Sequence, residues 1–148
     1  MFANINLKGF PLVNVDLFDI EKPSDFYDFL NFWEKLHDKK QEYIFLFNTE
    51  NMSMPSLSYA TKISEFIKKM KQKPYNPLSY SIICVKSSLI RNIVSLVFKF
   101  TSPMSPVYLV KTKEEGLKVY DEISKGNEVT CAKVMPSPIK KELSQVEM

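Results

Sequence analysis

The chain has 148 residues, enough for one domain that buries its own core without a metal or a disulfide. Hydrophobic residues make up 45% of it and aromatic residues 13%, which excludes an intrinsically disordered chain. Twenty basic residues against seventeen acidic ones give a net charge of only +3, and Arg91 is the single arginine, so we do not expect a nucleic-acid-binding surface.

The hydrophobic pattern predicts strands and helices in the order β-β-α-β-α-β-α-β-α. The second segment alternates apolar and polar residues, as a half-buried strand does, and the first helix repeats apolar residues from Phe26 to Leu36 at helical spacing. Residues 43–47 form a short continuous apolar run, typical of a strand buried on both faces. The expected strands cover residues 2–8, 12–18, 43–47, 80–85 and 107–110, and the expected helices begin at Pro23, at Ser53 or Pro55, at Leu89 and at Lys113.

Strands that alternate with helices predict an α/β fold. We expect a mostly parallel four- to five-stranded sheet with helices packed on it and the first strand antiparallel at one side. The pattern ends after residue 124, and Gly126, Pro136 and Pro138 indicate a flexible tail. The predicted division is a domain at 1–124 and a tail at 125–148.

Several short stretches are similar to one known family. Residues 13–20 are similar to a strand of that family and the turn after it, and residues 43–52 to its central strand and the loop leading to the second helix. Residues 81–91 are similar to its fourth strand and the opening of the third helix, and residues 107–117 to the last strand and the start of the last helix. In this order the stretches resemble the STAS domain family, best known for bacterial anti-sigma factor antagonists, over about residues 11–123. The resemblance implies the STAS-like fold and a regulatory, protein-binding function.

The resemblance also points to a phosphorylation site. In the regulatory members, an Asp-Ser-Ser-Gly type motif at the start of the second helix carries a serine that a partner kinase phosphorylates. Here the corresponding residues 53–58 read Ser-Met-Pro-Ser-Leu-Ser, without the aspartate or the glycine, and Ser56 is the nearest match. The alternative is that Ser53 or Ser56 caps the helix. Ser137, in a Ser-Pro-Ile-Lys pattern, is a second candidate, with an unmodified tail as its alternative.

The reactive residues argue against an enzyme. His37 is the only histidine, so an ordinary zinc site or a Ser-His-Asp system is not expected, and we predict a solvent-exposed residue at a helix end. The three glycines provide neither a P-loop nor a dinucleotide-binding turn. We therefore expect no catalytic residues, no metal and no cofactor.

Cys84 and Cys131 lack the spacing of a disulfide framework or metal site, and Cys84 lies in an apolar run typical of a core. We see neither a secretory signal nor a continuous apolar span long enough to cross a bilayer. These features predict a cytoplasmic protein.

The predicted helix at 89–100 carries apolar residues around more than one face. Either it is buried under the last helix and the proline-containing loop at 101–106, or an exposed apolar strip on it contacts a protein partner, a second copy or a lipid surface. We predict a partner-binding surface that combines this flank, whose arginine suits an acidic partner, with the start of the second helix, whose methionines repack easily. Its residues are Met52, Met54, Ser56, Ile90, Arg91, Val94 and Phe98.

The function we expect is a non-enzymatic regulatory or scaffolding module. A first alternative is the binding of a lipid or small apolar ligand, because related α/β folds hold such ligands between helix and sheet. Its candidate lining residues are Phe45, Phe47, Tyr80 and Phe98. A second alternative is an accessory subunit of a larger assembly.

Overall fold

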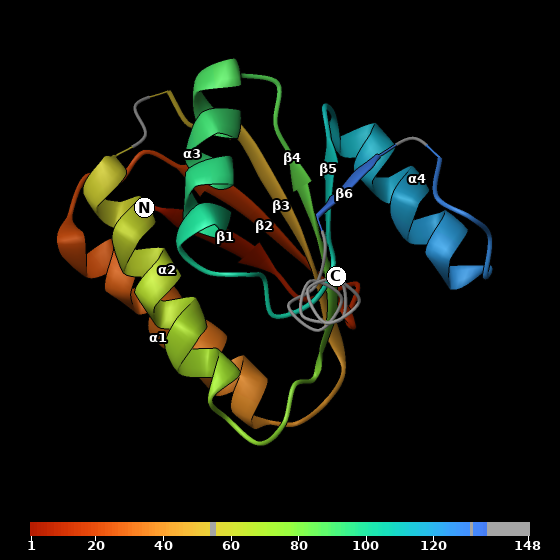
Figure 1. Ribbon diagram of the computed structural model, residues 1–148, viewed down its shortest axis with the longest axis horizontal. Coiled ribbons are helices and arrows are strands. Elements are labelled where there is room, and N and C mark those ends of the chain that lie inside the picture. Colours follow the sequence, from red (N-terminus) through yellow and green to blue (C-terminus); the bar gives the residue numbers. More distant parts are fainter. Residues whose placement is uncertain (54–55, 131, 136–148) are drawn as a thin grey trace, which may run out of the picture.

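The computed structural model describes residues 1–53, 56–130 and 132–135. This part of the chain forms one six-stranded sheet whose strands lie side by side in chain order, with four helices packed on it (Figure 1). The strands are β1 (Ala3–Asn6), β2 (Leu12–Phe18), β3 (Tyr43–Asn51), β4 (Leu78–Cys84), β5 (Val107–Val110) and β6 (Lys133–Met135). The helices are α1 (Pro23–Asp38), α2 (Leu57–Lys71), α3 (Ser88–Phe100) and α4 (Lys113–Ser124).

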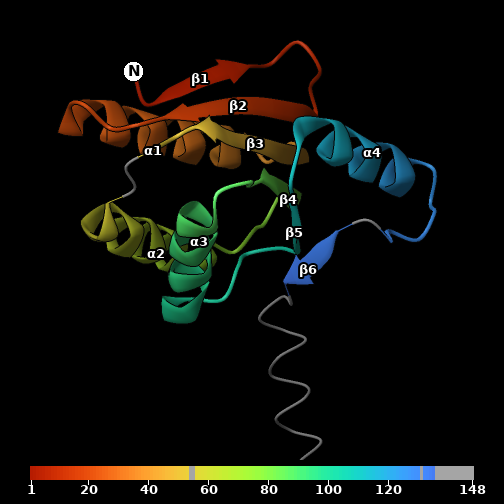
Figure 2. The same cartoon turned by 90° about the horizontal axis from the view of Figure 1, so that it is seen from above.

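The sheet is mixed. Strands β2 to β5 pair in parallel with their neighbours, whereas β1 and β6 pair antiparallel at the two edges. Helices α1, α2 and α3 each connect two parallel strands and lie on one side of the sheet, and α4 lies on the other side (Figure 2). The predicted α/β class is confirmed, with six strands in place of the expected four or five.

The sixth strand lies within the segment predicted to be a tail. In β6, Val134 pairs with Tyr108 of β5, and Val129 and Ala132 pack against the apolar layer under α4. The sheet therefore includes residues up to 135, within the segment predicted to be a tail. A strand of three residues is too short to show a hydrophobic period, and it forms because β5 offers a free edge.

Alternate residues along each strand face two different apolar layers. Val13 and Phe45 belong to the layer under α1, α2 and α3, whereas Leu46 and Ile82 belong to the layer under α4. At Gly116 of α4, an added Cβ would lie only 2.8 Å from Cδ1 of Leu46, so the missing side chain allows a close approach. Helix α4 therefore packs directly on its face of the sheet.

Helix α3 has 13 residues and begins after Ser87, whose side chain accepts a hydrogen bond from the backbone of Ile90, as expected for a capping serine. It lies beside α2, on the opposite side of the sheet from α4, so the predicted burial of α3 under the last helix is wrong. None of the helices in the described residues combines the length and apolar character needed to cross a bilayer.

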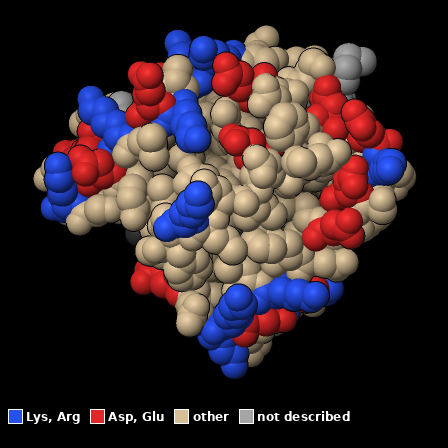
Figure 3. All heavy atoms as spheres, turned by 180° about the vertical axis from the view of Figure 1, so that it is seen from behind, with Lys and Arg blue, Asp and Glu red and all other residues tan. Residues whose placement is uncertain are grey.

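The side of the molecule seen in Figure 3 carries charges of both signs. Lysine and arginine side chains alternate with aspartate and glutamate around this face, and uncharged surface separates them. A nucleic-acid-binding protein concentrates positive charge on one face or along one helix. This face does not have that character, in line with the small net charge.

Candidate functional site: an apolar cavity

A cavity of about 200 Å³ lies between the sheet and helices α1, α2 and α3. Strands β2 to β5 provide its floor and the three helices its walls. Nearly all of the side chains around it are aliphatic or aromatic. The described residues that line it are Phe2, Leu17, Ile20, Phe29, Trp33, Phe47, Thr49, Met52, Ser56, Tyr59, Ala60, Ile63, Ile67, Leu78, Ser81, Ile83, Ile90, Ile93, Val94, Val97, Phe98, Pro103, Met104, Ser105 and Val107.

Short side chains at buried positions leave this space open. Ala60 on α2 and Ser81 on β4 are both buried, and each stands where a larger side chain would reach into the cavity. The residues of α3 that line the cavity include Ile93, Val94 and Phe98, all of them half-buried. The cavity is therefore bounded on one side by helix residues that keep part of their surface accessible.

An unfilled apolar cavity is energetically unfavourable. The pocket is partly open to solvent, so its apolar lining meets water, and a ligand that fills it would remove that surface from water. A bound apolar ligand that fills this space would thus stabilise the fold substantially.

Five hydroxyl side chains line the cavity, those of Thr49, Ser56, Tyr59, Ser81 and Ser105, and three of them are hydrogen-bonded. Thr49 donates to the backbone oxygen of Cys84 at 2.7 Å, Ser105 donates to that of Leu78, and Ser56 pairs with Ser58. The other two, Ser81 on β4 and Tyr59 on α2, have no hydrogen-bond partner among the described residues. None of the described lining residues is charged or a histidine, so the site is suited to binding and lacks an acid–base pair.

One end of the cavity is held by a contact between two loops. Asp19, in the loop after β2, accepts a hydrogen bond from the backbone nitrogen of Ser53 at 2.9 Å and another from its hydroxyl at 2.6 Å. Ile20 and Met52 stand next to these two residues and line the cavity. The hydrogen bonds therefore fix the positions of both apolar side chains at this rim.

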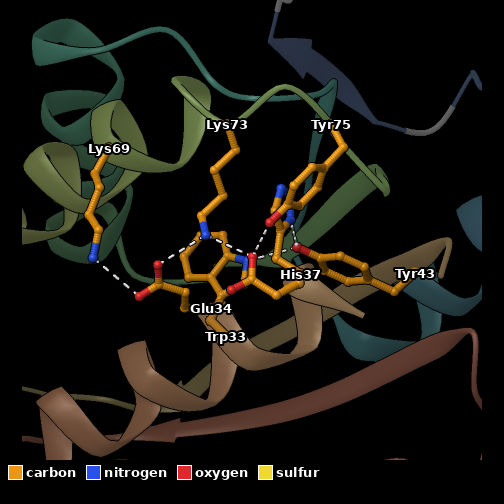
Figure 4. A network of polar contacts seen from close by, with 8 residues as sticks. Trp33, Glu34, His37, Tyr43, Lys69, Lys73 and Tyr75 are labelled. Carbon is orange, nitrogen blue, oxygen red and sulfur yellow. Dashed lines mark hydrogen bonds and ion pairs between the residues drawn. The ribbon is translucent and has the colours of Figure 1, made fainter. Parts of the chain in front are cut away.

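The α1 wall of the cavity is anchored by a buried polar chain. Trp33 lines the cavity, and its Nε1–H donates to the Tyr43 hydroxyl at 2.9 Å; Nδ1 of His37 lies 2.6 Å from the same hydroxyl (Figure 4). Because the indole can only donate, the phenolic oxygen accepts from Trp33, and it shares one proton with Nδ1 of His37 in a second hydrogen bond. This contact holds the His37 ring against Tyr43.

An ion-pair network continues from this chain toward the surface. Nζ of Lys73, at the end of α2, lies 3.1 Å from a carboxylate oxygen of Glu34 and 2.7 Å from one of Asp38, both on α1 (Figure 4). Tyr75 donates a further hydrogen bond to Asp38. These contacts lower the pKa of both carboxyl groups and raise the pKa of Lys73, and they tie α2 to α1 beside the cavity.

The structure corrects the prediction for His37. Its side chain is 0% exposed, so it is not a solvent-exposed residue at a helix end. It belongs to the inward face of α1 with Trp33, four residues before it, and its partner Tyr43 comes from the neighbouring strand β3. The sequence pattern did not predict this, because a histidine flanked by charged residues is typical of an exposed position.

We expect the stability of the protein to decrease as the pH falls below about 6.5. Burial is the main reason why the pKa of His37 lies below its usual value of 6.5. Between that value and the lower folded-state pKa, the unfolded chain binds a proton that the folded chain does not, so the free energy of unfolding decreases with decreasing pH. Urea unfolding at pH 7.5, 6.5 and 5.5 would measure this loss.

The matched control for this pH effect is His37→Gln, whose side-chain oxygen can accept the Tyr43 proton but does not titrate. Its stability should change less than that of the wild-type protein over the same pH interval. Equal pH dependence in the two proteins would show that another group is responsible.

The structure brings together most of the predicted partner-binding residues. Five of the seven line the cavity: Met52, Ser56, Ile90, Val94 and Phe98. Ile90 is only 3% exposed, and Val94 and Phe98 face inward, so this flank of α3 borders the cavity. Arg91 is exposed and donates to the backbone oxygen of Val85, while Met54 lies outside the described residues.

Of the two candidate phosphorylation sites, Ser56 and Ser137, only Ser56 lies within the described residues. Ser56 is exposed and stands at the N-cap of α2, but its side chain makes no capping hydrogen bond and pairs with Ser58 at 3.0 Å. Ser53 is bound to Asp19, so neither serine caps the helix as the alternative proposed. Ser137 lies outside the described residues.

Of the four aromatic residues predicted to line a cavity, only two do so. Phe47 and Phe98 line it, and Phe45 is buried in the same apolar layer without reaching it. Tyr80 faces the opposite side, where it contacts Tyr108, because neighbouring strand residues point to opposite faces. Sequence reasoning missed Trp33, Tyr59 and Ser81, although Ser81 and Ile83 share the period of two that marks one face of a strand.

Cys84 is a buried core residue, as predicted. It belongs to the apolar layer under α4, and burial raises the pKa of its thiol to about 12. A thiol with such a pKa remains protonated at neutral pH and is a poor nucleophile. Cys131 lies outside the described residues.

Comparison with known proteins adds no relative. No protein-family model matches the chain, and no similar curated protein and no similar solved structure were found.

Proposed function

We propose that this domain binds a small apolar ligand, or one apolar chain of a lipid, in the cavity between the sheet and helices α1, α2 and α3. The observation that carries the proposal is the cavity of about 200 Å³ with an almost wholly apolar lining. Binding pockets for small molecules are typically concave and apolar, with a few polar groups that orient the ligand. The lining includes side chains from α1, α2, α3 and the sheet, so a bound ligand would contact all of these elements.

The volume sets the size of the bound group. An engineered cavity of about 150 Å³ in another protein accommodates benzene. At the same ratio, 200 Å³ holds about eight carbon atoms. The ligand would be a short hydrocarbon, a small aromatic molecule, or part of a longer chain that leaves the cavity past the half-buried residues of α3.

Native mass spectrometry of the freshly purified protein tests this proposal. We expect a bound species that organic extraction removes, and a melting temperature that falls on extraction and recovers when toluene is added. A ligand at one hundred times its dissociation constant adds about 2.7 kcal/mol to the free energy of unfolding. A protein without adduct whose melting temperature does not respond to toluene would contradict the proposal.

A second candidate function is the regulatory or scaffolding interaction expected from the sequence. Leu89 and Phe100 favour it, because they are 53% and 49% exposed and lie on one side of α3. Large exposed apolar side chains on one helix are typical of a contact surface. If a partner binds there, Leu89→Lys should abolish its capture from a native host extract without lowering the melting temperature.

We also propose that the fold is of the STAS type. Support comes from the antiparallel first strand, the four parallel strands in chain order, and the placement of α4 alone on the second face.

A reduced, buried Cys84 suits a cytoplasmic location. Within a STAS-like domain, the exposed Ser56 is the candidate for phosphorylation, testable by phosphopeptide mapping of the protein isolated from its host.

A further inference from the structure

Ser81 is the one polar group on the cavity floor that is free to bind a ligand. It is 6% exposed, and its residue lies in the interior of β4, paired with Phe45 of β3 and Val107 of β5. Among the described residues its hydroxyl has no hydrogen-bond partner, whereas Thr49 and Ser105 already donate to backbone oxygens. Its Oγ is not among the buried, unpaired polar atoms of the described residues, so it keeps some accessible surface, and Ser81 lines the cavity where a ligand oxygen can reach it.

The rest of the lining determines which kind of polar group this hydroxyl would meet. No lysine, arginine or histidine is among the described lining residues, so nothing there would neutralise a buried carboxylate or phosphate. Burying an unpaired charge in an apolar site is strongly unfavourable. An uncharged oxygen avoids that cost, and a serine hydroxyl can donate to it or accept from it.

We propose that the ligand is an uncharged molecule with an alcohol or carbonyl oxygen, and that Ser81 binds that oxygen inside the cavity. This inference rests on the proposed function and adds the chemical class of the ligand. Because Ser81 is held between two neighbouring strands, its hydroxyl is presented from a rigid part of the sheet. A ligand with a charged head group would have to leave that group outside.

Three probes of matched size separate these possibilities: toluene, benzyl alcohol and benzoate at pH 8. Binding to the wild-type protein is followed by the shifts of methyl resonances of the lining residues. We expect toluene and benzyl alcohol to bind and benzoate to show no saturable binding. In Ser81→Ala, the affinity for benzyl alcohol should fall about fivefold to tenfold while that for toluene stays unchanged.

Two further variants control for structural effects. Ser81→Thr keeps the hydroxyl and should retain the preference for benzyl alcohol. Ser79→Ala removes a hydroxyl from the same strand that binds Glu42 and does not line the cavity, so it should leave both affinities unchanged. The melting temperature of ligand-free Ser81→Ala should stay close to that of the wild-type protein, because the hydroxyl that is removed has no hydrogen-bond partner among the described residues.

The outcomes distinguish the two proposals. If toluene and benzyl alcohol bind but Ser81→Ala alters both affinities equally or neither, the cavity binds ligands and the role of Ser81 is refuted. If benzoate binds as tightly as benzyl alcohol, the uncharged class is refuted. If none of the probes binds the wild-type protein, the proposed function fails together with this inference.

Discussion

Replacing Tyr43 with phenylalanine is expected to lower the free energy of unfolding by about 3 kcal/mol, because it leaves two buried polar groups without a partner. The Tyr43 hydroxyl accepts from Nε1 of Trp33 at 2.9 Å and contacts Nδ1 of His37 at 2.6 Å. Both Tyr43 and His37 are fully buried, so water cannot replace the lost hydroxyl. Urea unfolding monitored by circular dichroism measures the change.

Tyr75→Phe is the matched control for this prediction. It removes the same kind of hydroxyl from a partly accessible residue whose partner, Asp38, is exposed and also binds Lys73. We expect a loss below about 1 kcal/mol for that variant. A loss in Tyr43→Phe that is no larger than in Tyr75→Phe would show that the buried chain is not essential for stability.

Replacing Val94 with phenylalanine is expected to weaken toluene binding more than tenfold without destabilising the protein. Val94 lies on α3, is half-buried and lines the cavity, so a phenyl ring at this position would occupy the space of the ligand. Filling part of a void also improves packing, and we expect the melting temperature to be unchanged or to rise by about 2–4 °C. Toluene titration followed by methyl resonances, together with a thermal scan, measures both effects.

Leu89→Phe serves as the control for the blocked cavity. Leu89 is on the same helix but is exposed and does not line the cavity, so a ring there should leave toluene binding intact. Ile63→Phe, from the α2 side of the cavity, should reproduce the loss seen with Val94→Phe. Unchanged binding in both cavity variants would place the ligand at another site.

The element order could be predicted because it depends on local patterns. Alternation at residues 12–18 and continuous apolar runs in later strands identify the sheet, and apolar residues at helical spacing identify the helices. Helix α2 begins later than predicted, at Leu57, and β3 continues past Phe47 to Asn51. Polar residues at the end of β3 resemble a loop in the sequence, but they continue the pairing with β4 and β2.

The candidate site could be predicted only in part. The flank of α3 was identified because its apolar side chains exceed what one buried face requires, and the start of α2 because methionines there repack easily. The sequence could not show that both segments line the same cavity. Ile90 and Met52 are far apart in the chain, and they come together only because α2 and α3 pack on the same face of the sheet. For the same reason, an apolar surface expected to be exposed turned out to border a cavity that is partly open to solvent.

The amino-acid sequence by itself determined the order of the strands and helices from β1 to α4, the α/β class and the scarcity of reactive groups, since each of these follows from residue type and spacing. Only the tertiary structure decided that α4 stands alone on one face, that His37 is buried against Tyr43, and that Ser81 remains unpaired on a cavity floor. These features depend on which side chains are brought together from distant parts of the chain. A cavity is a property of how helices and sheet fit together, and no local pattern records an empty space between them.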